Sequence, residues 1–475
     1  MNFRERCHAA LEPLLLATVV FAPWAFGATA PWSERTLTVL GILLGLLALV
    51  ARPVGTHEHP SRRPFLLAFG IGWIGFLLYV ATSALNARAT AELGNGGVSL
   101  AYRDCIRWLP HSYDAPRTWM ALAKHLAVAG IFLATWRLAA GSMDISRAGA
   151  GRDWPPWLVR LLWVLSVSSA ALAMVSIAQR LSGTNRLLFL IPRVLPTGHI
   201  GAQSSFGPYP YQSNGAQYFN LVWPLTLGFW WCQLERILKR GGARPRLGTS
   251  PLSLLPFLAA LMIACPFVST SRGGALVCLA QLAGVLGLLA VGGRRIPRQI
   301  RLGALGGVAV ALGIAAAGDW SRLWARFERP DETLSGRKEI YAQARRMAKD
   351  FEPWGGGAES FRRLSDLYTD PGKPLWEAFV HNDWLEAHLS YGSVGLALLA
   401  LLSGLWLCSW LRGPWLGISR WFSAFALLSL AGMLLHARFD LPFQILSLNT
   451  LFALIGAVLL ATPPPWRRGG SAHRG

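Results

Sequence analysis

A histidine stands at the entrance to a long apolar segment near the end of the sequence. The segment reads V-H-N-D-W-L-E-A-H-L-S-Y-G-S-V-G-L from Val380 to Leu396, so His381 precedes a helix whose first turn would hold Asp383 and Glu386. A neutral imidazole there could accept a hydroxyl proton near neutral pH, but a histidine can equally cap a helix or sit at an interface. The residues alone leave both interpretations of His381 open.

His381 and His388 are not predicted to bind a metal ion together. Seven residues along a helix would separate its ring from that of His381 by roughly 10 Å, which is too far for one ion. The six cysteines show no C-x-x-C spacing and mostly lie in or beside apolar runs, where cysteine behaves as a small hydrophobic residue. We therefore expect no metal, no disulfide and no cofactor.

An arginine interrupts two apolar runs at Ser269-Thr-Ser-Arg-Gly-Gly274, with almost no loop around it. A charge at a membrane boundary is costly, so Arg272 is a functional candidate unless it only anchors the chain at the interface. The start of the following helix would offer N–H groups to an anion, and a guanidinium binds phosphate oxygens well. Arg272 is therefore predicted to hold a diphosphate.

Three other polar segments could contribute to a site. Arg337 follows Ser335-Gly336 at the start of an amphipathic helix that runs to Phe351, where it would bind an anion or belong to a solvated basic face. Arg438 and Asp440 share a short loop and are predicted to have a structural role, as a polar pair with each other or with a neighbour. The aromatic and amide residues of Gly207–Gly215 suit sugar contacts or an interfacial aromatic belt.

The elements that would position these residues are membrane-spanning helices. The chain of 475 residues is 53% hydrophobic and 15% charged, and its apolar runs are long enough to cross a bilayer. We predict an all-α polytopic membrane protein with about twelve spans. They lie near 13–30, 36–51, 64–84, 118–138, 157–179, 216–234, 252–270, 273–291, 302–317, 387–411, 421–436 and 444–461.

The net charge of +21 comes from basic residues that gather between alternate spans. This positive-inside pattern explains the charge better than a nucleic-acid partner and predicts cytoplasmic termini. The candidate site residues then lie on the outer side. We expect nine spans within 1–317, an outer insertion at 318–386 with the amphipathic helix, three spans within 387–461 and a disordered tail at 462–475.

The motifs resemble, in order and spacing, those of the O-antigen ligase and O-antigen polymerase family over roughly residues 200 to 460. They are Thr270-Ser-Arg-Gly-Gly, Ser335-Gly-Arg with Ile340-Tyr341, Pro353-Trp-Gly-Gly-Gly, His381-Asn-Asp-Trp-Leu, Tyr391-Gly-x-x-Gly-Leu, and His436-x-x-x-Asp440-x-Pro-x-Gln444 with Asn449. No single motif decides the family, and the resemblance depends on their order.

The resemblance implies a glycosyltransferase-C-like fold in a bacterial inner membrane. Such an enzyme transfers a glycan from undecaprenyl diphosphate to an acceptor hydroxyl at the periplasmic face, without a nucleotide sugar and generally without a metal. On that pattern His381 would be the general base and Arg272 would hold the leaving diphosphate. The glycan or acceptor would contact Gln212, Asn214, Asn382 and Asp383.

One part of the family pattern is missing. The family tends to have a further arginine before the span at 216, often just ahead of an asparagine, where this chain has Gln212-Ser213-Asn214. Arg193 or Arg186 is predicted to take over this second phosphate contact, beside Arg337.

Other functions remain open on the sequence. The acceptor could be a lipopolysaccharide core sugar, a growing polysaccharide or, in a protein O-glycosyltransferase of the same fold, a protein. A transporter or flippase of a lipid-linked glycan would use similar cations, but near mid-membrane and often on broken helices. Clustering of the charges at one face favours an enzyme over a transporter. A third interpretation, a purely structural membrane protein, would not explain why Arg272 is followed by two glycines.

Overall fold

The computed structural model describes most of the chain. The described residues are 3–51, 61–94, 97–147, 154–184, 186–192, 204–239, 250–292, 296–317, 323–324, 328, 331–369, 379–413, 415–416 and 418–466. Arg193 and most of the predicted tail lie outside them.

Each predicted apolar range coincides with a long helix. These are α1 (Phe3–Trp24), α2 (Pro31–Val50), α3 (Arg63–Leu85), α4 (Ala115–Arg147), α5 (Pro156–Leu181), α6 (Gln212–Lys239), α7 (Leu254–Val268), α8 (Arg272–Gly292), α9 (Arg298–Ala317), α13 (Asp383–Leu411), α14 (Arg420–His436) and α15 (Leu446–Leu460). By length and composition, eight described helices could cross a membrane: α1 to α5, α7, α8 and α13. The all-α, multi-pass membrane architecture is confirmed, while the number of twelve spans stays a prediction.

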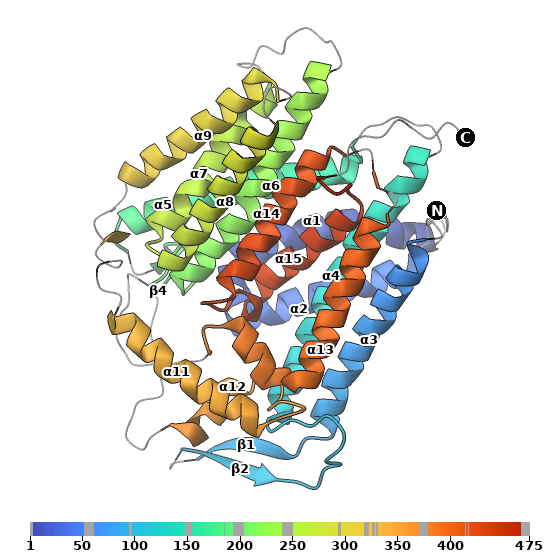
Figure 1. Cartoon of the computed structure of the whole chain (residues 1–475), viewed down its shortest axis with the longest axis vertical. Helices are drawn as coiled ribbons and strands as arrows, with labels where there is room; N and C mark the ends of the chain where they lie inside the picture. Colours follow the sequence, from blue (N-terminus) through green and yellow to red (C-terminus); the bar gives the residue numbers. More distant parts are fainter. Residues whose placement is uncertain are drawn as a thin grey trace.

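Shorter elements gather at one end of the helical bundle. The antiparallel hairpin of β1 (Ala89–Gly94) and β2 (Gly97–Tyr102) lies there beside α11 (Asp331–Asp350) and α12 (Phe361–Leu364) (Figure 1). The remaining short elements are η1 (Phe26–Ala28), β3 (Arg186–Leu187), β4 (Ile191–Pro192), η2 (Pro251–Ser253), η4 (Ser365–Tyr368) and η5 (Pro442–Gln444).

Helix α6 is the centre of the bundle. Every residue from Gln212 to Cys232 is buried, and α7, α8 and α14 pack around it (Figure 1). A helix buried on all faces must satisfy its polar side chains inside the protein. Asn220 Nδ2 donates to the Gly274 carbonyl of α8 at 2.9 Å, and Gln281 Nε2 donates to the Asn220 carbonyl at 2.9 Å. These bonds fix the position of α8 along α6.

The predicted amphipathic helix is α11. Its apolar positions Ala344, Met347 and Phe351 are buried in a cluster with Val380 and Leu389 around the start of α13. Its arginines at 345 and 346 remain exposed. The burial of one face explains why a helix with a strongly polar composition lies across the end of the bundle instead of entering it.

The glycine-rich segment after α11 is bound to α13 and is not the flexible loop that its composition predicts. Gly356 and Gly357 donate their backbone N–H groups to the carbonyls of Leu389 (2.7 Å) and Ser390 (3.2 Å). Gly392 interrupts α13 with φ +59°, and a Cβ there would lie 2.1 Å from the Pro353 carbonyl oxygen. The two glycine motifs therefore dock backbone to backbone and hold the segment after α11 on the bundle.

Replacing Gly392 with alanine should destabilise this junction. The backbone conformation of Gly392, φ +59° and ψ −172°, costs about 1–3 kcal/mol for a residue with a Cβ, and the clash with Pro353 adds to that cost. Thermal unfolding in detergent should therefore show a lower midpoint for Gly392→Ala. Gly404→Ala is the matched control, because a Cβ at this position in the same helix meets nothing within 4 Å. Equal midpoints for the two variants would contradict the docking role of Gly392.

Candidate active site

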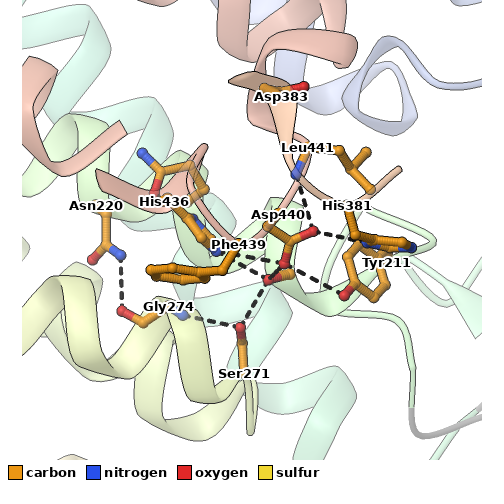
Figure 2. A network of polar contacts seen from close by, with 12 residues as sticks. Tyr211, Asn220, Ser271, Gly274, His381, Asp383, His436, Phe439, Asp440 and Leu441 are labelled. Atoms are coloured by element: carbon orange, nitrogen blue, oxygen red, sulfur yellow. Dashed lines mark hydrogen bonds and ion pairs between the residues drawn. The ribbon is translucent and has the colours of Figure 1, made fainter. Parts of the chain in front are cut away.

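The site is centred on a buried carboxylate in the loop between α14 and α15. Asp440 is 3% exposed, and His381 Nδ1 lies 3.2 Å from its Oδ1 (Figure 2). Ser213 at the start of α6 donates its hydroxyl to Oδ2, and the Leu441 backbone N–H donates to Oδ1 at 3.1 Å. Three segments that are far apart in sequence therefore meet at one carboxylate.

The environment keeps Asp440 ionised. Burial alone would raise the pKa of its carboxyl, but the interactions with His381 and His436 outweigh burial and hold the pKa well below its usual range. An ionised Asp440 accepts a hydrogen bond from Nδ1–H of His381 and so selects the tautomer whose Nε2 carries the lone pair. His381 is thereby arranged as a proton acceptor, with a carboxylate that can stabilise its protonated form.

The backbone and neighbouring rings also set the position of His381. Its φ is +56°, a conformation that costs a non-glycine residue energy and is typical of functional positions. The Tyr341 hydroxyl donates to the His381 carbonyl at 2.8 Å, and the Tyr211 ring lies edge-on at 5.6 Å between centroids. Its side chain is 13% exposed. The strained backbone directs the imidazole toward Asp440 and away from the helix that follows.

The two residues after His381 have structural roles. Asn382 caps α13, because its Oδ1 accepts the Leu385 N–H at 3.1 Å. The capping function considered for His381 therefore belongs to its neighbour. The Asp383 carboxylate accepts the Phe443 N–H at 2.7 Å and Gln444 Nε2 at 3.0 Å. Both contacts lie in the loop that carries Asp440, so Asp383 positions that loop.

A second histidine, which the sequence motif included without a role, joins the network. His436, at the end of α14, is 1% exposed and donates from Nδ1 to Gln217 Oε1 of α6 at 2.6 Å. Its Nε2 lies 3.2 Å from Ser213 Oγ and 3.6 Å from Asp440 Oδ2. The spacing of four residues between His436 and Asp440 is the signal that could have revealed their contact.

The structure shows Asp440 paired with neighbouring residues and not with Arg438. Asp440 is buried and bonded to His381 and Ser213, whereas Arg438 is exposed. The physical reason is the difference in burial, because a buried carboxylate takes the partners that are buried with it.

Two of the predicted arginines lie near the carboxylate network. Arg337 of α11 donates from Nη1 to the Phe439 carbonyl at 2.7 Å and from Nη2 to the Tyr211 hydroxyl at 3.4 Å. The same hydroxyl lies 3.4 Å from Asp440 Oδ2. Arg272, the first residue of α8, lies within the range of electrostatic interaction with the Arg337 guanidinium and the Tyr211 side chain. A pair of neighbouring guanidinium groups suits an anion with more than one charge.

The glycines after Arg272 serve helix packing. Ser271 Oγ accepts the Gly274 N–H at 3.1 Å, so this serine caps α8. A Cβ at Gly273 would lie 2.6 Å from the Phe439 ring, and a Cβ at Gly274 would lie 2.4 Å from the Cβ of Ala216. These glycines let α8 approach α6 and the Asp440 loop.

The polar side chains at the start of α6 are buried and bonded to other parts of the protein. Gln212 Oε1 accepts from Arg180 Nη2 (3.2 Å) and from the Thr270 hydroxyl (3.3 Å), and Asn214 is buried two residues further along. Arg180 also donates to the Ser269 carbonyl at 2.7 Å. It thus ties the end of α5 to α6 and to the turn before Arg272, a role that sequence reasoning did not assign.

The two substitute arginines are not seen at this site. Arg193 lies outside the described residues. Arg186 is exposed and donates to the Leu190 carbonyl at 3.1 Å within its own hairpin. Among the residues that the structure describes, no group of three His, Cys, Asp or Glu side chains is arranged to hold a metal ion.

Comparison with known families agrees with the motifs. Residues 257–400 match the O-antigen ligase family. The resemblance seen in the sequence is thereby confirmed for this region. The O-antigen ligase region includes Arg272, Arg337 and His381, whereas Asp440 and α6 lie outside the matched residues. A search of curated proteins found no match.

Replacing Asp440 with asparagine should change the pH dependence of stability. The folded pKa of Asp440 lies below its unfolded value, so its contribution is present above about pH 4 and is lost as the pH falls further. Asp440→Asn should lower the thermal midpoint at pH 7, because it removes hydrogen bonds to a charged group. Such bonds contribute about 1.5–3 kcal/mol to the free energy of unfolding. The difference from the unmodified protein should shrink below pH 4.

Asp104→Asn is the control for this measurement, because Asp104 is an exposed carboxylate. It should leave the midpoint within error at every pH. A pH-independent difference between Asp440→Asn and the unmodified protein would show that the charge of Asp440 does not contribute to stability.

Proposed function

We propose that this protein is a metal-independent glycosyltransferase of the O-antigen ligase or polysaccharide polymerase type. It would transfer a glycan from undecaprenyl diphosphate to an acceptor hydroxyl on a lipopolysaccharide core sugar or a growing polysaccharide. The observation that carries this proposal is the His381–Asp440 pair beside Arg272 and Arg337. Of these residues, Arg272, Arg337 and His381 lie in the region that matches the ligase family.

The reaction uses each of these groups. The acceptor hydroxyl attacks the sugar carbon that is bonded to the diphosphate, and its proton passes to Nε2 of His381. The bond between that carbon and the diphosphate oxygen breaks, and the diphosphate leaves with the electron pair. Arg272 and Arg337 stabilise the negative charge that develops on it, and Asp440 stabilises the imidazolium. Arg193 stays a candidate for a further phosphate contact.

We place this chemistry at the periplasmic face of a bacterial inner membrane, with both termini in the cytoplasm. The site residues lie at the start of α8, in the first half of α11, just before α13 and just after α14. At the other end, Arg62 before α3 donates to the Leu460 carbonyl at the end of α15 at 2.8 Å, near segments rich in arginine. Charges at one end of the bundle favour transfer over transport, which needs access from both sides.

Removing the base or the diphosphate contact should abolish transfer. In proteoliposomes with an undecaprenyl-diphosphate glycan donor, His381→Ala should lower the rate roughly 10²–10⁴-fold, as expected for loss of a general base. Arg272→Ala should cause a comparable loss, and Arg346→Ala should not, because Arg346 is exposed on α11 outside the site. The product is identified by mass spectrometry. Full turnover by both site variants would refute the mechanism.

The orientation can be measured separately with single cysteines in a background that lacks the native ones. Lys349→Cys on the exposed face of α11 should react with a membrane-impermeant thiol reagent in spheroplasts. Arg298→Cys at the start of α9 should react only after permeabilisation. The opposite pattern would place the site in the cytoplasm.

A further inference from the structure

One face of helix α3 is a continuous, exposed apolar stripe. Leu67, Ile71, Ile74 and Leu78 follow one another at spacings of three or four residues, and each is more than half exposed. Leu85, the last residue of the helix, is exposed as well. Such a stripe is what a helix presents to lipid, and α3 is among the helices that could cross a membrane.

The length of α3 indicates where its end lies in a bilayer. Its 23 residues correspond to about 35 Å, whereas the hydrocarbon core of a bilayer is roughly 30 Å thick. A membrane-spanning α3 therefore places Leu85 and the following Asn86 at the boundary between acyl chains and headgroups.

The loop between β2 and α4 is fastened to this end of α3. Asn86 Oδ1 accepts the Ile106 N–H at 2.8 Å, and Asn86 Nδ2 donates to the carbonyls of Ile106 (2.9 Å) and Pro110 (3.2 Å). One side chain thus bonds both ends of the segment 106–110. The segment is held at the depth of the last turn of α3.

The backbone of Arg88 closes the same loop. Its N–H donates to the Ser112 carbonyl at 2.8 Å, and its carbonyl accepts the Arg103 N–H at 2.8 Å. The chain that follows β2 accordingly lies beside the end of α3 (Figure 1). A loop that is already held at both ends loses little conformational entropy when it docks on a surface.

The side chains of this loop suit a membrane surface. Trp108 is 73% exposed and Ile106 is 49% exposed, with the exposed Arg107 between them. Trp119, in the second turn of the α4 helix that follows, is also partly exposed. Tryptophan is enriched at the boundary between membrane and water, and arginine can lay its stem on apolar surface while its guanidinium stays in the polar layer.

We propose that the segment 103–110 is a membrane-docking loop, which inserts Ile106 and Trp108 among the lipid headgroups at the end of α3. The occupant of this apolar surface is lipid and not a second protein, because the loop continues the exposed stripe of α3 beyond its last residue. The Asn86 side chain sets the depth of the loop. This inference does not depend on the proposed transfer function.

The test measures the depth of spin labels on the full chain in nanodiscs, with the native cysteines replaced. Labels at Ile106→Cys, which retains Trp108, and at Trp108→Cys report on the loop. Leu78→Cys in the stripe of α3 is the lipid reference, and Lys349→Cys on the exposed face of α11 is the water reference. Collisions are measured with oxygen, which concentrates in lipid, and with a nickel chelate, which stays in water.

Both loop labels should lie between the two references. Their collision rate with the nickel chelate should be severalfold lower than that of the label at 349, and their ratio of oxygen to nickel collisions should be higher. A nickel collision rate equal to that at 349 for both loop labels would overturn the proposal. So would exclusion of both reagents, because a surface covered by protein, such as a second copy of the chain, is reached by neither.

Asn86→Ala tests how the loop is held at this depth. The substitution removes three hydrogen bonds to the loop, so the label at Ile106→Cys should gain collisions with the nickel chelate. The label at Leu78→Cys should be unchanged, which shows that α3 keeps its place in the bilayer. An unchanged label at 106 would refute the role of Asn86 in setting the depth.

Discussion

The buried carboxylate of Asp440 imposes the central constraint on this structure. A charge removed from water is costly unless protein groups replace the lost hydration. Here the replacement comes from His381, His436, Ser213 and the backbone. Because these groups belong to the start of α13, the end of α14 and the start of α6, the carboxylate can be satisfied only when all three elements meet. The same requirement that stabilises the ion also assembles the proton acceptor.

The glycine contacts around this carboxylate explain how polar elements come so close at the end of a membrane bundle. Gly273 and Gly274 bring α8 against the Asp440 loop and α6, which carries Arg272 to the edge of the network. Gly392 does the same for the segment after α11. Small residues are favoured where helices pack inside membranes, since association there relies on close contact and hydrogen bonds. The geometry of the proposed site and the packing of the helices therefore depend on the same positions.

Helix α11 connects two parts of the site. Arg337 of α11 donates to the Tyr211 hydroxyl and to the Phe439 carbonyl beside Asp440. The Tyr341 hydroxyl, about one turn further along the same helix, donates to the His381 carbonyl. A single amphipathic helix thus contacts both the loop that carries Asp440 and the backbone of His381. Its buried apolar face packs around the start of α13 and fixes these contacts.

The sequence by itself determined the helices and the chemistry of the separate motifs. Apolar run length and helical periodicity do not depend on distant residues, so the ranges of the long helices and the amphipathic face of α11 could be predicted, as could Arg272 and His381 as candidates. Only the tertiary structure decided which residues meet. The partner of His381 is Asp440, the cap of α13 is Asn382, and His436 joins from α14. Such contacts depend on how helices far apart in the chain pack around α6. Apart from the four-residue spacing of His436 and Asp440, spacing along one segment carries no information about them.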